Sequence, residues 1–165
     1  MRISPAVAAW AAAVRKNTAL VVLACAMFLS ACWAFAPGNE PRLIVVDSSA
    51  DRGNGTLRHA IESANASSQR SLIDIRLAPS DPIKPLTELP AIEASGLAIH
   101  GHGAWLEGGA CGRSRGRRGC DGLVIKGPSV RVEQLNARGF MFDGIAVIGA
   151  SASGVVLSGC HCRDN

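Results

Sequence analysis

The sequence lacks tyrosine, and its three tryptophans and four phenylalanines leave it poor in aromatic residues. A shortage of aromatic side chains disfavours a conventional globular sandwich or helical bundle, because such cores depend on large side chains. Glycine, by contrast, occurs 18 times among the 165 residues. This combination favours an architecture of short strands separated by frequent tight turns.

A strong net charge is also missing from most of the chain. The formal charge of +4 includes three basic residues near the start, which are Arg2, Arg15 and Lys16. Beyond residue 36, 14 basic residues face 13 acidic ones. Nucleic-acid-binding domains carry a clear basic excess. We therefore expect no nucleic-acid partner.

Residues 1–36 have the pattern of an export signal. Arg15 and Lys16 precede an apolar stretch that runs to Leu29, and small residues follow it. A basic segment, a short apolar core and small residues before a cleavage point are typical of a secretory signal. Residues 29–32 read LSAC and resemble the lipobox of bacterial lipoproteins, in which the cysteine becomes lipidated. Cys32 is therefore the candidate lipidation site.

Two other interpretations of this leader stay open. Residues 34–36 read AFA, which fits ordinary signal cleavage, although Pro37 would follow the cut bond. Alternatively, residues 19–36 remain as a membrane anchor, since 18 mostly apolar residues just suffice to cross a bilayer. All three interpretations export the body of the chain. We expect a lipoprotein facing the outer membrane or periplasm, an anchored protein, or a secreted one.

The first folded segment is predicted to be a strand–helix–strand unit. Residues 37–42 are rich in proline and glycine and form a predicted tether. A short apolar strand follows at 43–46, and Thr56 can cap a helix whose apolar residues recur at i, i+3, i+4 and i+7 from Leu57. Residues 73–77 then alternate between apolar and charged side chains, which indicates a second strand with one solvated face.

From residue 97 onward the sequence is repetitive. Apolar triplets begin at Leu97, Leu123 and Ile145, and Asp-Gly recurs after 22 residues. Residues 130–140 also align with residues 155–165 at an offset of 25. Strands this short cannot bury a face within their own coil, so they must stack on the coils above and below. We predict a mostly β fold, a parallel β-helix with about three coils in residues 97–165, the last of them incomplete.

A resemblance to a known family supports this fold. Residues 51–65, DRGNGTLRHAIESAN, resemble the G-x-G-S/T-L-R-x-A-I-x-x-A-N segment of many bacterial secreted right-handed parallel β-helix proteins. These proteins belong to the pectate-lyase-like superfamily, which includes polymorphic outer-membrane proteins. Residues 89–92 and 97–103 resemble the entry into the family's first full coil.

The resemblance implies that residues 43–96 form a strand–helix–strand cap over the open end of a right-handed β-helix. Such a cap would cover a sheet edge that otherwise promotes aggregation. It also implies a truncated chain, because fuller relatives continue with further coils. The superfamily contains lyases, hydrolases, adhesins and passive stalks, so the resemblance alone does not assign an activity.

A basic loop between two cysteines interrupts the repeat. Cys111 and Cys120 are a candidate disulfide in an exported protein. The loop between them presents guanidinium groups that suit an acidic polysaccharide or another polyanion. These groups belong to Arg113, Arg115, Arg117 and Arg118. A solvated insertion loop without a ligand is the alternative, because charge runs are usually solvated.

Two further clusters resemble metal sites at first sight. Cys160 and Cys162 fall on apolar positions of the repeat, which indicates small core residues with His161 pointing outward. His100 and His102 lie on one side of a strand and are interpreted as exposed residues beside a turn. We therefore predict no metal site and no cofactor.

Asp121 and Asp143 are weak catalytic candidates. They occupy equivalent turns of successive coils and would lie roughly 5 Å apart if the coils stack regularly. Two carboxylates at that separation suit calcium binding or acid–base chemistry on a glycoside. Each precedes a glycine, however, and Asp-Gly is common in turns. The sequence contains no nucleophile triad, phosphate loop or zinc-ligand spacing.

The expected function is that of an envelope-associated surface protein without catalytic activity. Its long parallel-strand face would contact a polysaccharide or another cell-surface component, as an adhesin does. Two alternatives stay open: the N-terminal part of an extracellular polysaccharide lyase or hydrolase, and a fragment with no function of its own. The sequence leaves enzymatic activity undecided and favours its absence, and it does not indicate the oligomeric state.

Overall fold

The computed structural model describes residues 40–111 and 119–165. Residues Pro41–Asn165 form one compact unit. This unit is mostly β, a right-handed parallel β-helix of about four turns. Every strand pair in it is parallel, so the predicted fold class is confirmed.

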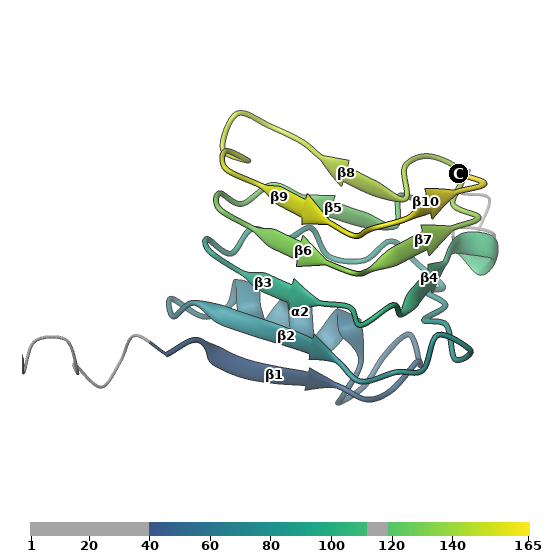
Figure 1. The fold of residues 1–165 in the computed structure, drawn as a ribbon, viewed down its shortest axis with the longest axis horizontal. Coiled ribbons are helices and arrows are strands. Elements are labelled where there is room, and N and C mark those ends of the chain that lie inside the picture. The colour runs from purple at the N-terminus through teal and green to yellow at the C-terminus, as the bar shows by residue number, and fades with distance from the viewer. Residues whose placement is uncertain (1–39, 112–118) are drawn as a thin grey trace, which may run out of the picture. The chain divides into compact units, whose positions relative to one another are not determined.

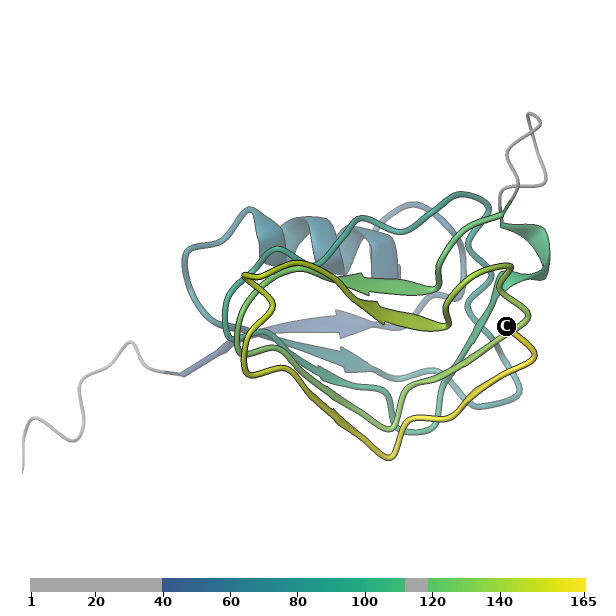
Figure 2. The same cartoon turned by 90° about the horizontal axis from the view of Figure 1, so that it is seen from above.

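The strands form three parallel sheets that run along the stack of coils (Figure 1). The five-stranded sheet contains β1 (Arg42–Val46), β2 (Ser71–Ile75), β3 (Ala98–His100), β6 (Arg131–Glu133) and β9 (Val156–Ser158). The three-stranded sheet contains β4 (Trp105–Glu107), β7 (Asn136–Arg138) and β10 (Cys162–Arg163). The two-stranded sheet contains β5 (Leu123–Ile125) and β8 (Ile145–Val147). Figure 2 looks at the coils from above, where they overlie one another.

Apolar side chains of successive coils stack inside the helix. On the five-stranded sheet, Ile73 pairs with Ile99, Ile99 with Val132, and Val132 with Leu157. The last pair confirms the offset of 25 residues that the sequence predicts. Leu123 pairs with Ile145 across the two-stranded sheet, which confirms the 22-residue step.

One part of the predicted repeat is wrong. The triplet that begins at Leu97 resembles those at Leu123 and Ile145, but it leads into β3, whereas they form β5 and β8. The three triplets therefore belong to two different sheets. Short triplets of leucine and β-branched residues fit the inner face of every sheet of the β-helix. Their composition therefore does not indicate to which sheet a triplet belongs.

The proline-rich segment after β2 completes the first coil without forming regular strands. Ile83 makes a parallel bridge to Leu106, and Ile92 makes one to Ile125. The segment therefore extends the three-stranded and two-stranded sheets by one bridge each. Prolines lack a backbone N–H and limit strand pairing to such isolated points.

Helix α2 (Leu57–Asn65) connects β1 to β2 and packs on both strands. Thr56 caps it by accepting a hydrogen bond from the His59 N–H at 3.3 Å. Figure 1 shows α2 behind β2. The helix thus covers a face of the first strand pair, while β1 pairs only with β2 within the described segments. The strand–helix–strand unit exists as predicted, but the outer edge of β1 is not covered by α2.

Candidate functional site

Polar side chains of successive coils gather at the corner between the five-stranded and three-stranded sheets. The chain bends there by means of residues in the left-handed region. Gln134 (φ 52°) makes the bend between β6 and β7, and Gly159 (φ 62°) makes it between β9 and β10. The bend between β3 and β4 uses His102 (φ 50°) and Gly103 (φ 84°).

This bend is two residues longer in the β3–β4 coil than in the coil above it. The Gly103 N–H donates to the Gln134 carbonyl at 2.7 Å. The Asn136 N–H donates to the Ala104 carbonyl at 2.9 Å. The backbone between Gly101 and Ala104 therefore has two residues, His102 and Gly103, that have no counterpart in the next coil. The extra length places the His102 side chain at the corner.

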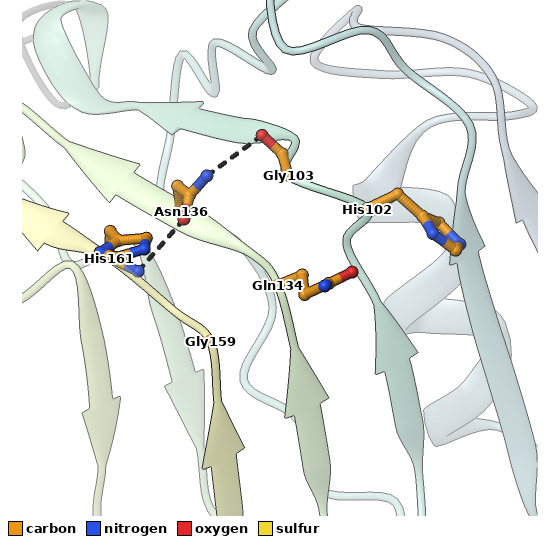
Figure 3. Close-up of a pocket in the computed structure, with 6 residues that line it drawn as sticks. All are labelled: His102, Gly103, Gln134, Asn136, Gly159 and His161. Atoms are coloured by element: carbon orange, nitrogen blue, oxygen red, sulfur yellow. Dashed lines mark hydrogen bonds between the residues drawn. The ribbon is translucent and has the colours of Figure 1, made fainter.

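A shallow hollow of about 290 Å³ lies along this corner (Figure 3). Its lining comes from three coils and consists of His102, Gly103, Gln134, Asn136, Gly159 and His161. Figure 3 shows Asn136 between Gly103 and His161, with a hydrogen bond to each. The hollow is open to solvent and rich in donors and acceptors, which suits a hydroxylated ligand.

Asn136 forms hydrogen bonds to the backbone of two other residues that line the hollow. Its Nδ2 donates to the Gly103 carbonyl at 3.1 Å, and its Oδ1 accepts from the His161 N–H at 3.1 Å. The residue is 7% exposed. A buried amide that satisfies backbone groups of the coils on either side links three coils through one side chain.

Beside the hollow, Trp105 lies on the outer face of the three-stranded sheet with two arginines over its ring. The guanidinium carbon of Arg138 is 5.1 Å from the ring centroid, and that of Arg163 is 4.9 Å away. Both distances lie within the range of cation–π contact. Trp105, Asn136 and His161 occupy equivalent positions of β4, β7 and the approach to β10. The hollow and the Trp105 cluster therefore form one continuous surface.

The charge of this surface is only partly neutralised. Glu107 lies 3.4 Å from Lys84 and 3.5 Å from Arg138. Arg163, which is 58% exposed, has its nearest carboxylate partner, Asp164, at 3.9 Å. Two arginines thus present donors around an aromatic ring, one of them with a long and exposed ion pair.

A second cluster lies on the outer face of the five-stranded sheet. Asp74 of β2 pairs in register with His100 of β3, which pairs with Glu133 of β6. His102 reaches this row from the lengthened corner, with its Nε2 2.7 Å from Asp74 Oδ1. One ligand atom each from Asp74, His100 and His102 lies within 4.8 Å of the other two.

Two charged neighbours influence this cluster. Arg76 Nε lies 2.8 Å from the second oxygen of Asp74, and His100 Nε2 lies 3.6 Å from a Glu133 oxygen. The hydrogen bonds from Arg76 and then from His102 lower the pKa of Asp74, and they outweigh the opposing effect of burial. Asp74 is therefore a carboxylate at neutral pH.

The structure pairs Cys111 with Cys120 as a disulfide, with their Cα atoms 6.0 Å apart, as the sequence suggests. That separation is typical of disulfides. The four candidate polyanion ligands, Arg113, Arg115, Arg117 and Arg118, lie outside the described residues.

Asp121 and Asp143 lie in consecutive turns that contact each other through the Asp121 carboxylate. The Asp143 N–H donates to Asp121 Oδ1 at 2.9 Å, and the Gly122 N–H donates to the Asp143 carbonyl at 2.8 Å. The Asp121 carboxylate thus ties together two consecutive turns. This geometry supports the turn interpretation of both residues.

Cys160 and Cys162 are free thiols. Cys160 packs partly against the core, and Cys162 pairs in register with Ala137 on the inner side of the coil. Cys162 is nevertheless exposed, because no described strand lies beyond β10. The predicted inward positions hold, but the burial of Cys162 does not. His161 lies outward and lines the hollow.

Cys32 and the apolar leader lie outside the described residues. Among the helices of residues 40–111 and 119–165, none is both apolar and long enough to span a bilayer.

The sequence alone does not reveal Trp105, Asn136 or Asp74 as site residues. Each acquires its partners from coils that are 25 or more residues away. In the sequence, Asp74 is only one of the polar positions of the alternating segment 73–77. The register of β2 with β3 would have identified Asp74, but the repeat in the sequence begins at residue 97 and does not include β2.

Comparison of the chain with known protein families, curated proteins and solved structures gives no match. The resemblance to the pectate-lyase-like superfamily therefore stays a prediction.

Proposed function

We propose that this chain is an exported β-helix protein without catalytic activity, which binds an anionic polysaccharide of a cell surface. The binding surface consists of Trp105, Arg138 and Arg163 together with the adjoining hollow. The observation that carries the proposal is the pair of guanidinium groups at 5.1 and 4.9 Å from the Trp105 centroid.

This arrangement suits a sugar acid for electrostatic and geometric reasons. Guanidinium groups bind carboxylates and sulfates through paired N–H donors. Contact with the aromatic ring limits the freedom of both arginines, so less side-chain entropy is lost when a ligand binds. Asn136 and His161 extend the polar surface along the stack of coils.

Binding to polygalacturonate and to uncharged dextran tests the proposal. We expect the full chain to bind polygalacturonate at low ionic strength, to lose affinity as salt is added, and to ignore dextran. Arg163→Ala should weaken binding about tenfold, since a hydrogen bond to a charged group contributes about 1.5–3 kcal/mol. Isothermal titration calorimetry measures both effects.

Arg131→Ala is the matched control. Arg131 is 55% exposed and Arg163 is 58% exposed, but Arg131 belongs to the five-stranded sheet. Equal losses for both variants would show unspecific charge attraction and contradict the proposed surface. Absence of polygalacturonate binding by the unmodified chain would contradict it as well.

The alternative of a lyase or hydrolase has no supporting observation within the described residues. Asp121, one of its two candidates, accepts a hydrogen bond from the backbone N–H of Asp143. Replacing both residues with asparagine and assaying uronate-rich polymers tests the alternative. Turnover by the unmodified chain that these substitutions abolish would establish an enzyme and overturn a purely binding role.

The exported location rests on the leader and is supported by the Cys111–Cys120 disulfide, since disulfides persist mainly outside the cytoplasm. We propose a lipid anchor at Cys32. Metabolic labelling with a fatty acid should mark the unmodified chain and spare Cys32→Ser. Equal labelling of the two would exclude the lipoprotein and leave ordinary secretion or an uncleaved anchor.

A further inference from the structure

We propose that Asp74, His100 and His102 form a binding site for Zn²⁺ on the outer face of the five-stranded sheet. Among the described residues, these three bring their ligand atoms within 4.8 Å of one another. The site is separate from the proposed polysaccharide surface, apart from the shared corner at His102. Neither proposal depends on the other.

The backbone explains why the three side chains converge. Asp74 and His100 are register partners on adjacent parallel strands, so their side chains lie side by side on one face. A corner of ordinary length would have no residue equivalent to His102. The longer corner supplies this histidine, whose Nε2 lies 2.7 Å from Asp74 Oδ1.

Two imidazole nitrogens and one carboxylate are a ligand set typical of Zn²⁺, which binds them at about 2.0–2.2 Å. Tetrahedral bonds of that length separate neighbouring ligand atoms by roughly 3.3 Å. The His102–Asp74 pair at 2.7 Å is already close enough, and no other pair of ligand atoms exceeds 4.8 Å, so small rotations of the exposed imidazoles of His100 (38%) and His102 (55%) suffice to reach this geometry. Three protein ligands leave one position for water.

Glu133 is placed to become the outer hydrogen-bond partner of His100 when zinc binds, a support that zinc-bound histidines usually have. Its carboxylate lies 3.6 Å from His100 Nε2, on the opposite side of the strand from Asp74. Carboxylates that hydrogen-bond a metal-ligating imidazole orient it and raise its basicity. We therefore expect Glu133→Gln to weaken zinc binding without abolishing it.

Arg76 provides the test that separates a metal site from a simple ion pair. Its guanidinium lies 2.8 Å from Asp74 and repels a cation at the same carboxylate. In a metal site, Arg76→Gln should strengthen zinc binding several-fold. If His102 and Asp74 merely form an ion pair, Arg76→Gln produces no zinc binding at all.

The free thiols of Cys160 and Cys162 require a control, because thiolates also bind Zn²⁺. The full chain is therefore alkylated before titration. Co²⁺ then serves as a spectroscopic substitute for Zn²⁺, since it gives d–d absorption in a tetrahedral site. Metal binding that is present before alkylation and lost after it would show sulfur ligands and contradict the proposed ligand set.

Nuclear magnetic resonance of the four imidazoles gives the deciding readout. We expect Zn²⁺ to shift the His100 and His102 signals in the alkylated chain and to leave His59 and His161 unchanged. His100→Ala or Asp74→Asn should weaken binding about tenfold or more. His59→Ala, at an exposed position of α2, should not change the affinity.

The unmodified chain decides the outcome even if a variant fails to fold. No saturable Zn²⁺ binding after alkylation, or shifts spread over all four histidines, would overturn the proposal. Far-ultraviolet circular dichroism establishes that each variant used for comparison has kept its fold.

Discussion

At the scale of single residues, Gly101 shows how closely the coils approach each other. A Cβ atom added there would lie 2.5 Å from the Gln134 carbonyl oxygen and 2.7 Å from Leu135 Cα. Both neighbours are backbone atoms of the next coil, which cannot rotate away as a side chain could. The absence of a side chain at Gly101 is therefore what allows β3 and β6 to pair up to the corner.

We expect Gly101→Ala to destabilise the fold by about 1–3 kcal/mol, as overpacking a tight contact does. Gly109→Ala is the matched control, because a Cβ atom at Gly109 meets nothing within 4 Å. Both substitutions reduce the entropy of the unfolded chain equally. Urea denaturation measures the difference, and equal stabilities would show that the coils separate easily at this point.

The Cys162 thiol should react slowly despite its exposure. Burial of the sulfur raises its pKa, and the neighbouring Cys160 and Asp143 raise it further. A raised pKa favours the neutral thiol in the folded state, so the folded state loses this advantage as the pH rises through that pKa. Only the thiolate is nucleophilic, so alkylation below that pH is suppressed.

In a Cys160→Ser background, we expect alkylation of folded Cys162 to reach half its limiting rate at a higher pH than in the urea-unfolded chain. Asp143→Asn should lower this midpoint only in part, because burial is the larger cause. Mass spectrometry follows the modification. A midpoint at or below that of the unfolded chain would contradict the raised pKa of the thiol.

The sequence predicted the side of the coil on which each cysteine lies, because the alignment at an offset of 25 placed both on apolar positions. It could not predict the exposure of Cys162. Burial depends on a neighbour above β10, and no described strand lies there. A periodic pattern predicts whether a side chain points inward, whereas its burial also requires a neighbouring strand that covers it.

At the scale of elements, Arg58 connects α2 to the segments around it. Its side chain is 7% exposed and lies 2.7 Å from Asp51. It also donates to the Thr87 carbonyl at 2.8 Å and the Glu88 carbonyl at 2.9 Å. The arginine of the family-like segment thus links α2, the turn before it and the proline-rich segment.

Arg58→Ala should cost about 3–5 kcal/mol, because it leaves Asp51 as a buried charge with few partners. Arg52 provides an internal control. It lies 3.4 Å from the same carboxylate, but it is 70% exposed, so Arg52→Ala should cost less than about 1 kcal/mol. Chemical denaturation of the two variants compares them directly, and equal effects would exclude the linking role of Arg58.

The register of β6 with β9 can be predicted from the sequence, whereas that of β3 with β6 cannot. The first pair has an uninterrupted 25-residue spacing, as between Val132 and Leu157. The second has a spacing of 33 between Ile99 and Val132. The longer corner and the segment between Cys111 and Cys120 lie within that coil. Insertions conceal a period even when the strands on either side of them stack without a gap.

At the scale of the whole molecule, stability should vary along the stack. In a solenoid each coil contacts only its neighbours, so a coil with one neighbour is held by one interface. Ile99, between two coils, is fully buried, whereas Leu157 of β9 is 44% exposed although it faces inward.

We expect amide hydrogen exchange to be slowest in β3 and β6 and fastest in β9 and β10. Ile99→Ala should cost about 2–5 kcal/mol, and Leu157→Ala clearly less. Native-state exchange and denaturation together measure this gradient. Uniform protection across all coils would show that the unit unfolds as a single block.

Both candidate sites exist only because the coils stack. Trp105 and Arg163 are far apart in sequence, as are Asp74 and His102, yet each pair meets across neighbouring or next-nearest coils. A reader of the sequence can identify chemically interesting residues such as His100. Their partners follow only from the register, and the register follows only from the packing of inner residues such as Ile99.

The two additional residues at the β3–β4 corner show how such a protein can diversify. The corner adds the His102 side chain, while Gly101, Gly103 and Ala104 all keep hydrogen bonds to the adjacent coil. Lengthening one bend therefore leaves the hydrogen bonds between the coils intact and presents an additional side chain to solvent. Over evolutionary time the residues at each corner can change independently, while the stacked strands keep their geometry.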